Sequence, residues 1–198
     1  MRLSEIASLS AEHLWLVAIA VWVAMLIAAP TAVLLTRHVR LRRATLAVVN
    51  VVQTIPSLAL FGFLLPFLGV GKVTAVLALV LYALLPLLRN TVVGILGVDG
   101  GVLESAVAMG MTRRQILWKV ELPLAFPTIL AGVRIATVTT IGTATIAAAI
   151  GGGGLGTFVF RGLAMADTRT ILAGAVPAAI MAIAADEVLG WVERKFSY

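Results

Sequence analysis

Residues 14–35 read LWLVAIAVWVAMLIAAPTAVLL, an apolar run that contains no charged side chain. A helix needs about 20 mostly apolar residues to cross the hydrocarbon core of a bilayer, so this run is long enough to span one. Arginines follow it between residues 37 and 43, as in a stop-transfer signal, and glutamates precede it. The run is therefore predicted to be a retained membrane helix and not a cleaved signal peptide.

The composition of the whole chain favours the same conclusion. Of its 198 residues, 61% are hydrophobic and 12% are charged, and the mean hydropathy is +1.09. A typical soluble domain is about 45–50% apolar and about 25% charged. The chain is thus predicted to be an integral membrane protein, which argues against a soluble enzyme, a disordered regulator or a coiled coil. It has no cysteine and two scattered histidines, so neither a thiolate nor a histidine metal site is expected.

Further segments are apolar enough to span a membrane, namely residues 44–68, 73–98, 124–150 and 170–191. Pro56 and Pro66 lie inside the first of these, and Arg89 and Asn90 interrupt the next. The fold class is predicted to be an all-α integral membrane protein, one domain over residues 1–198 with about five transmembrane helices. Because the spans take about half of the chain, no separate soluble domain is expected.

The basic residues predict how the spans are oriented. Ten of the 15 lysines and arginines, Arg89 among them, are assigned to loops or a tail on one side of the predicted membrane. The positive-inside rule places that side in the cytoplasm, so the N-terminus is expected outside and the C-terminus inside. This topology accounts for the net charge of +6, and no basic helix points to nucleic acid. Arg134, inside the fourth span, is expected to snorkel to the interface between lipid and cytoplasm.

The longest cytoplasmic connection, residues 99–123, contains a short amphipathic helix. Within residues 102–109 a helix would carry one apolar face, made of Leu103, Ala106 and Val107 and continued by Gly110. A second helix is expected over residues 113–120 with Thr112 as its N-cap, and Pro123 suits the first turn of the fourth span. Such a helix could lie on the bilayer surface or dock in a groove of another protein, and composition alone favours the bilayer.

The same connection carries a spaced motif. Glu104, Ser105 and Ala106 are followed by Gly110 and then by Leu122-Pro123, which resembles the E-A-A…G…L-P signature of membrane subunits of binding-protein-dependent ABC importers. In that family the helix at the motif is the coupling helix, which seats in the ATPase subunit. The resemblance therefore implies that these six positions form the ATPase-coupling loop, between the third and fourth spans.

Other stretches extend the resemblance to one branch of the family. Residues 53–60, 81–91 and 141–156 look like the glycine betaine/carnitine/choline branch, and the methionine importers are the nearest alternative. The resemblance implies a bacterial or archaeal inner-membrane permease that is not itself an enzyme, working by alternating access. It also implies these partners: ABC ATPase subunits that hold ATP and Mg²⁺, an extracytoplasmic solute-binding protein, and a second permease copy or a paralogue. No cofactor is expected on this chain, because its glycine-rich stretch at 151–156 lacks the strand and βα unit of a dinucleotide site.

Polar residues inside the spans suggest where a solute could pass. In the second span the spacing 0, 3, 4 and 7 puts four of them on one helical face, and the fourth span adds two threonines: Asn50, Gln53, Thr54, Ser57, Thr137 and Thr140. Threonines also join membrane helices to one another, so path, subunit interface and helix packing all remain open. The alternatives from other classes are an ATPase-independent carrier, which would need ionisable groups in its spans, and a membrane scaffold.

Overall fold

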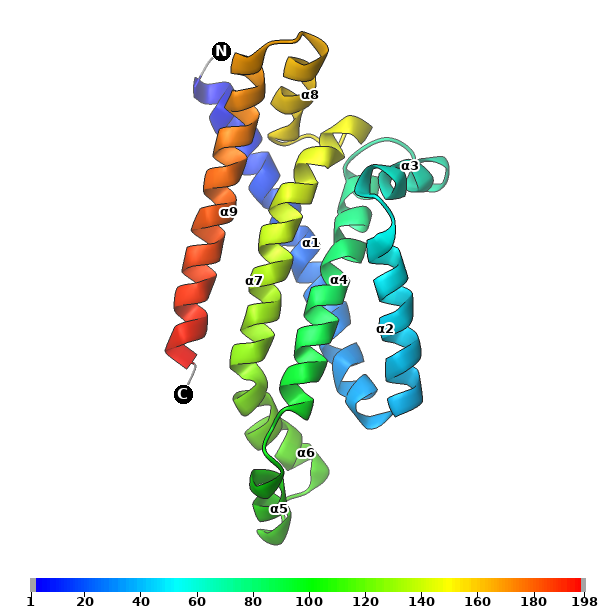
Figure 1. Ribbon diagram of the computed structural model, residues 1–198, viewed down its shortest axis with the longest axis vertical. Helices are drawn as coiled ribbons and strands as arrows, with labels where there is room; N and C mark the ends of the chain where they lie inside the picture. The colour runs from blue at the N-terminus through cyan, green and yellow to red at the C-terminus, as the bar shows by residue number, and fades with distance from the viewer. Residues whose placement is uncertain (1–2, 197–198) are drawn as a thin grey trace.

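The computed structural model describes residues 3–196, and in this part of the chain all regular structure is helical (Figure 1). In chain order the elements are α1 (Leu3–Arg37), α2 (Val39–Thr54), α3 (Ser57–Leu68), α4 (Lys72–Leu96), α5 (Gly100–Ala108), α6 (Arg113–Ile116), the π-helical turn η1 (Leu117–Glu121), α7 (Leu122–Ala147), the 3-10 turn η2 (Ala148–Ile150), α8 (Gly156–Ala164) and α9 (Thr168–Phe196).

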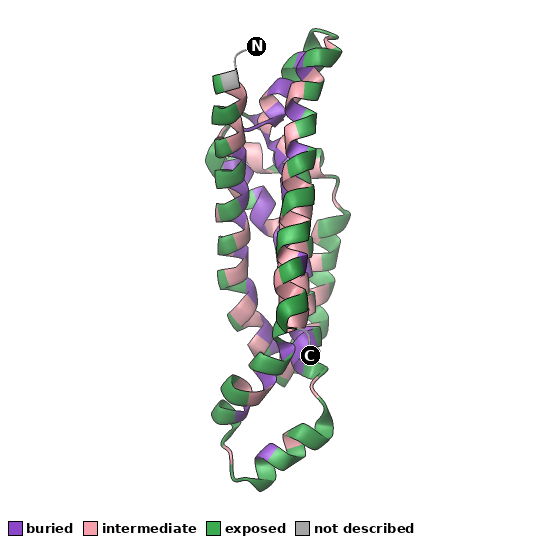
Figure 2. Cartoon of the chain, turned by 90° about the vertical axis from the view of Figure 1, so that its left-hand side faces the viewer, coloured by how far each residue is buried: buried purple, intermediate pink, exposed green. Residues whose placement is uncertain are grey.

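Four helices of the described chain are long and apolar enough to cross a membrane, and they match four of the five predicted spans. They are α1, α4, the helix that includes α7, and α9. In Figure 1, α9, α7, α4 and α2 lie side by side, with α1 behind α4 and α7. The inner side of α1 is a stripe of alanines four residues apart, all with no exposed surface: Ala20, Ala24, Ala28 and Ala32. Small side chains let helices approach closely in a membrane, which explains why α1 lies against α4. Figure 2 shows this division of α1 into a buried inner and an exposed outer side.

The remaining predicted span, 44–68, is not one helix. It divides into α2 and α3, whose axes differ by 101°, and α3 turns across the end of the bundle (Figure 1). The break falls at Ile55 and Pro56, where Ile55 has an extended backbone with φ −70° and ψ 126°. A proline disfavours helical backbone in the residue before it, so Pro56 ends α2 and starts a new direction. Pro66 lies inside α3 without breaking it.

Contacts from α4 hold this bend. The Tyr82 hydroxyl donates a hydrogen bond to the Ile55 carbonyl, which α2 leaves free at its end. In return, Gln53 Nε2 donates to the Tyr82 carbonyl at 2.8 Å. In a regular helix that carbonyl would accept from the N–H of residue 86, but residue 86 is Pro86, which has none. Gln53 therefore supplies the donor that the proline of α4 cannot.

A glutamate of α1 joins three segments at the α8 end of the bundle. The Glu12 carboxylate of α1 accepts from the Gly154 N–H at 2.9 Å and pairs with Lys72 Nζ at 2.6 Å, which links α1, α4 and the loop before α8. Gly154 has φ +72°, a left-handed conformation that favours glycine. Helix α8 lies between the predicted fourth and fifth spans.

The start of α9 is fixed by an acidic side chain outside the helix. Asp167 accepts hydrogen bonds from the Thr170 hydroxyl and from the Arg169 backbone N–H, the latter at 3.0 Å. These donors, the Thr170 hydroxyl first, lower the pKa of the Asp167 carboxyl below its usual value, because they stabilise its charged form.

Candidate functional site

The loop 99–123 forms a capped helix that extends beyond the bundle (Figures 1 and 2). Asp99 begins α5, since its Oδ1 accepts from the Val102 N–H at 3.1 Å. At the other end the Gly110 N–H bonds to the Val107 carbonyl at 2.9 Å, and the Met111 N–H to the Ala106 carbonyl at 3.1 Å. This pair of bonds is a Schellman cap, which needs a left-handed residue at Gly110, and Gly110 has φ +75°.

The surface of α5 differs from the predicted apolar face. Ala106 is buried against the segment that follows, and Leu103 is half-buried, but Val107 is 63% exposed. Glu104 and Ser105 are exposed as well. The exposed apolar and acidic side chains of α5 therefore face away from the rest of the chain, where another molecule could contact them.

The return from α5 is continuous with the next long helix. Thr112 and Gln115 form a capping box, with Thr112 N donating to Gln115 Oε1 at 2.7 Å, so the predicted cap at Thr112 is confirmed. The separate second helix expected over 113–120 is wrong, because α6 passes through η1 into α7 as one helix, Arg113–Ile150. Pro123 cannot donate to a carbonyl four residues back, and the π-turn before it widens the helix at that place.

An ion pair anchors this junction to α1. Glu121 is buried, and its Oε2 accepts from Arg37 Nη2 at 2.7 Å. Leu122 and Pro123, the last two motif positions, follow Glu121 directly and begin α7. The base of the loop thus continues into α7 and is also attached to α1.

The six predicted path residues do not form one surface. Asn50, Gln53 and Thr54 are exposed on α2, but Ser57 is the first residue of α3, beyond the bend, so the four do not share a helical face. Thr54 Oγ1 donates to its own helix at the Val51 carbonyl, 2.7 Å away.

The two threonines of α7 also have internal roles. Thr137 is half-buried and donates to the Val133 carbonyl at 2.8 Å, and Thr140 is 1% exposed, so it faces the interior of the chain. A residue that contacts a passing solute has to be accessible, and Thr140 is buried in this arrangement of helices, so its place in a path stays a prediction.

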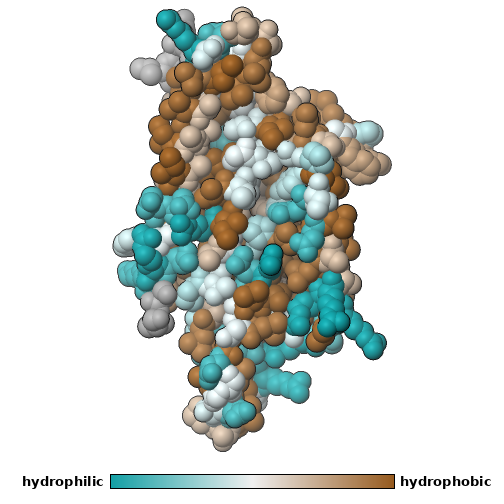
Figure 3. Space-filling view, in the orientation of Figure 1, coloured by the Kyte–Doolittle hydropathy of each residue, from teal (hydrophilic) through white to brown (hydrophobic). Residues whose placement is uncertain are grey.

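An open hollow of about 530 Å³ lies between α2, α4 and α7. We call it the Arg89 groove, and its lining residues are Gln53, Leu85, Pro86, Arg89, Asn90, Val93, Ile135 and Thr139. Figure 3 shows this face of the molecule, where pale to teal surface lies between brown apolar regions. Of the six predicted path residues, Gln53 is the one that lines it.

Arg89 was assigned to a cytoplasmic loop on the sequence alone, and that is wrong. It lies inside α4, because the helix continues to Leu96. The signal for the groove was present in the sequence as the Arg89-Asn90 interruption of an apolar run. That Thr139 lines the groove follows from its position beside α4, which the sequence does not give.

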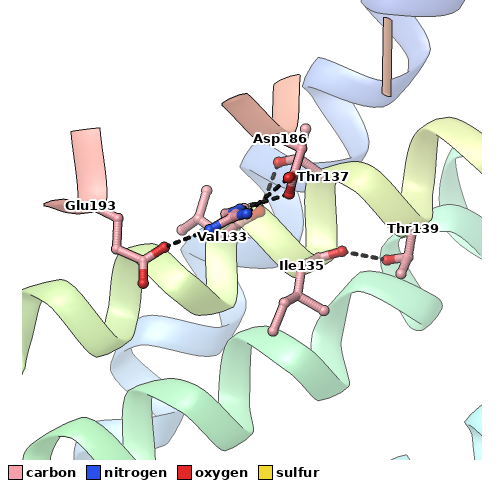
Figure 4. A network of polar contacts seen from close by, with 7 residues as sticks. Val133, Ile135, Thr137, Thr139, Asp186 and Glu193 are labelled. Atoms are coloured by element: carbon pink, nitrogen blue, oxygen red, sulfur yellow. Dashed lines mark hydrogen bonds and ion pairs between the residues drawn. The ribbon is translucent and has the colours of Figure 1, made fainter. Parts of the chain in front are cut away.

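Arg134 has carboxylate partners in the structure, and its predicted snorkelling to the interface stays a prediction. Its guanidinium forms a two-point ion pair with Asp186 of α9, at 2.6 and 2.8 Å, and Nη1 lies 3.4 Å from Glu193 Oε2 (Figure 4). Gly190 lies beside this network, and a Cβ there would be 3.0 Å from Arg134 Nη1. The acids lie far along the chain from Arg134, which is why a reading of the fourth span by itself could not find them.

The comparisons with known proteins agree with this architecture. The family model described as "Binding-protein-dependent transport system inner membrane component" matches residues 12–198. The chain is 48% identical over 191 residues to the glycine betaine/carnitine/choline transport system permease protein OpuCB of Bacillus subtilis (strain 168), which covers 96% of this chain and 88% of that one. It is 49% identical over 184 residues to the carnitine transport permease protein OpuCD of Listeria monocytogenes, with 92% and 82% covered.

Solved structures share the fold. A chain of the inward-facing MetNI methionine ABC transporter superposes with a TM-score of 0.90 at 23% identity, with 100% of both chains covered. A chain of an amino acid ABC transporter with histidines gives a TM-score of 0.79 at 20% identity, with 96% and 93% covered. The family resemblance read from the loop motif is therefore confirmed, and the chain belongs to the inner-membrane components of binding-protein-dependent transport systems.

Proposed function

We propose that this chain is the transmembrane permease subunit of an ATP-driven importer for small quaternary-ammonium osmoprotectants such as glycine betaine, carnitine or choline. The observation that carries the substrate class is the 48% identity, over 96% of the chain, to a permease named for these three solutes. The fold similarity to a methionine importer rests on 23% identity, so it supports the architecture and not the solute.

The coupling loop is the part that would receive energy from ATP. Helix α5 is capped at both ends, extends beyond the bundle, and presents Glu104 and Val107 to the outside. A short amphipathic helix with exposed apolar side chains suits a groove on a partner protein. The partner in this proposal is an ABC ATPase, which places the α5 end in the cytoplasm and the N-terminus outside.

Two further partners complete the machine. The Arg89 groove is open on one side, so one copy of the chain does not enclose a path, and a second copy or a paralogous permease would close it. An extracytoplasmic solute-binding protein would deliver the solute at the α8 end. ATP binding and hydrolysis on the ATPase would then move α5 and open the path to each side in turn.

Uptake of labelled solute tests this proposal. The chain is expressed with its candidate ATPase and binding protein in a bacterial host that lacks osmoprotectant uptake, and glycine betaine, carnitine, choline and methionine are offered separately. We expect uptake of at least one quaternary-ammonium solute, lost when the ATPase carries an inactive catalytic site. Uptake that survives without an active ATPase would favour a self-sufficient carrier, and uptake of methionine alone would refute the solute class.

A further inference from the structure

Arg89 carries a positive charge inside the long apolar helix α4, and no described acidic side chain pairs with it. Arg89 lies seven residues before the end of α4, which is about 10 Å along the helix axis. A charged group inside a membrane helix is costly unless it is paired or lines a polar path. Among residues 3–196 the structure gives the Arg89 side chain neither an ion pair within 4.0 Å nor a hydrogen bond.

Arg134, the other basic side chain set well inside a long apolar helix, contrasts with Arg89, because two carboxylates partner it. Five of the acidic residues are taken up in ion pairs: Glu121 with Arg37, Glu12 with Lys72, Asp186 and Glu193 with Arg134, and Glu5 with Arg161. The chain has nine acidic residues, and Asp99 and Asp167 are used as helix caps. That leaves Glu104 on α5 and Glu187 on α9, neither of which lines the groove. The described chain therefore offers Arg89 no acid of its own.

The neighbouring polar groups in the groove are already bonded to the chain. Gln53 donates to the Tyr82 carbonyl and Asn90 Nδ2 to the Pro86 carbonyl, each at 2.8 Å. Thr139 Oγ1 donates to the Ile135 carbonyl at 2.8 Å. Each of the two amides has one further N–H, but Arg89 is the lining residue that offers a charged donor group to a molecule in the groove. A second hollow toward the α5 end is lined by Arg42 and Arg89 together, so the positive character continues along this face.

We propose that Arg89 is a carboxylate-binding position in the solute path, and that it makes the permease favour zwitterionic solutes over purely cationic ones. The inference rests on the proposed function. Glycine betaine and carnitine carry a carboxylate as well as a quaternary ammonium, whereas choline carries the cation alone. A guanidinium binds a carboxylate through charge-assisted hydrogen bonds and repels a cation at the same place.

The test compares solutes within one transporter, so that differences in expression cancel. Wild type, Arg89→Gln and Arg89→Lys are reconstituted with the same ATPase and binding protein, and initial rates of glycine betaine and choline uptake are measured. We expect Arg89→Gln to lower the betaine-to-choline ratio about tenfold and Arg89→Lys to retain most of it. An unchanged ratio in Arg89→Gln overturns the proposal. Wild type that transports neither solute refutes the proposed function instead.

A second pair of variants leaves Arg89 in place. Thr139 is exposed and lines the same groove, so Thr139→Glu supplies a fixed carboxylate, and Thr139→Gln is its uncharged control of equal size. We expect Thr139→Glu to shift preference toward choline and Thr139→Gln to resemble wild type, and identical ratios for the two would contradict the proposal. If the binding protein rejects choline, the preference for betaine over choline is measured without it. Saturation-transfer NMR then compares the binding of the two solutes to wild type and variants of the permease in nanodiscs.

An anionic lipid headgroup offers Arg89 the same oxyanion chemistry. The vesicles are therefore prepared both from phosphatidylcholine alone and with an added anionic lipid. A ratio that responds to Arg89→Gln in both membranes supports the solute as the partner. A response that occurs only with anionic lipid would assign Arg89 to the lipid and overturn the proposal.

Discussion

Replacement of Gly110 by alanine isolates the contribution of one backbone angle to coupling. Gly110 has φ +75°, and a Cβ placed there would meet no atom within 4 Å. The substitution therefore introduces no collision, and its cost is the left-handed conformation itself. That conformation costs a non-glycine residue about 1–2 kcal/mol, which corresponds to a factor of about 5–30 in an equilibrium.

The cost falls on the cap of α5 and not on the membrane bundle. Helix α5 has nine residues, its packing partner within the chain is α6, and its last turn is closed by the two hydrogen bonds around Gly110. Gly110→Ala should insert into the membrane normally and should bind the ATPase about 5–30-fold more weakly if docking requires the capped helix. The affinity of Gly110→Asn for the ATPase should fall between those of wild type and Gly110→Ala, because asparagine tolerates left-handed backbone better than alanine does.

The matched control is Gly100→Ala at the other end of the same helix. Gly100 also has open space around its Cβ position, but it has ordinary helical backbone, so alanine there should be neutral or slightly stabilising. Binding is measured by interferometry between nanodisc-embedded permease and purified ATPase, and uptake is measured in parallel. If Gly110→Ala and Gly100→Ala bind within twofold of each other, the cap is not part of docking and the reasoning fails.

The other predictions concern the bundle and its ends. Asp186→Leu should lower the unfolding temperature in detergent, because Arg134 loses its two-point partner, and adding Arg134→Leu should restore part of the loss; a double variant less stable than the single one would contradict this. Tyr82→Phe should cost about 1 kcal/mol and loosen the α2–α3 bend, seen as faster hydrogen exchange at Ile55, whereas unchanged exchange there would show that Pro56 alone maintains the bend. Because the folded-state pKa of Asp167 is lowered, the stability it gives the start of α9 is present above its unfolded pKa and lost as the pH falls below about 4, through the folded pKa. Hydrogen exchange of the first turn of α9 at pH 6 and pH 3 checks this, with Asp167→Asn expected to remove the difference.

The apolar runs predicted the long helices well because a span depends on composition over many residues. The predicted boundaries 73–98 and 170–191 compare with Lys72–Leu96 and Thr168–Phe196 in the structure. The short helix predicted within residues 102–109 compares with α5, Gly100–Ala108, since the spacing of apolar residues along a helix is a local signal.

The sequence could not show what a contact between distant residues decides. Arg134 is held by Asp186, 52 residues further along the chain, and nothing in the fourth span indicates that partner. Asn50 and Ser57 are seven residues apart, which would put them on one face of a straight helix. The bend at Pro56 places Ser57 on α3 instead, so the two do not share a face. Thr139 and Thr140 are the same residue type in the same apolar span, so the sequence does not distinguish them. The position of the neighbouring helices leaves Thr139 exposed and buries Thr140.

The continuous helix from Arg113 to Ile150 has a mechanical consequence. It has 38 residues, so at 1.5 Å per residue it measures about 57 Å from the coupling loop to the far end of the bundle. A rod of that length acts as a lever. With its pivot at Glu121, the arm to Arg113 is about 12 Å long and the arm to Ile150 about 44 Å, so a tilt of about 10° displaces the two ends by about 2 Å and about 8 Å, in opposite directions. A push on α5 could thus open one end of the path while it closes the other, without any relay of side chains between them. The Arg37–Glu121 ion pair joins the short arm of this lever to α1, and it would set where the lever turns.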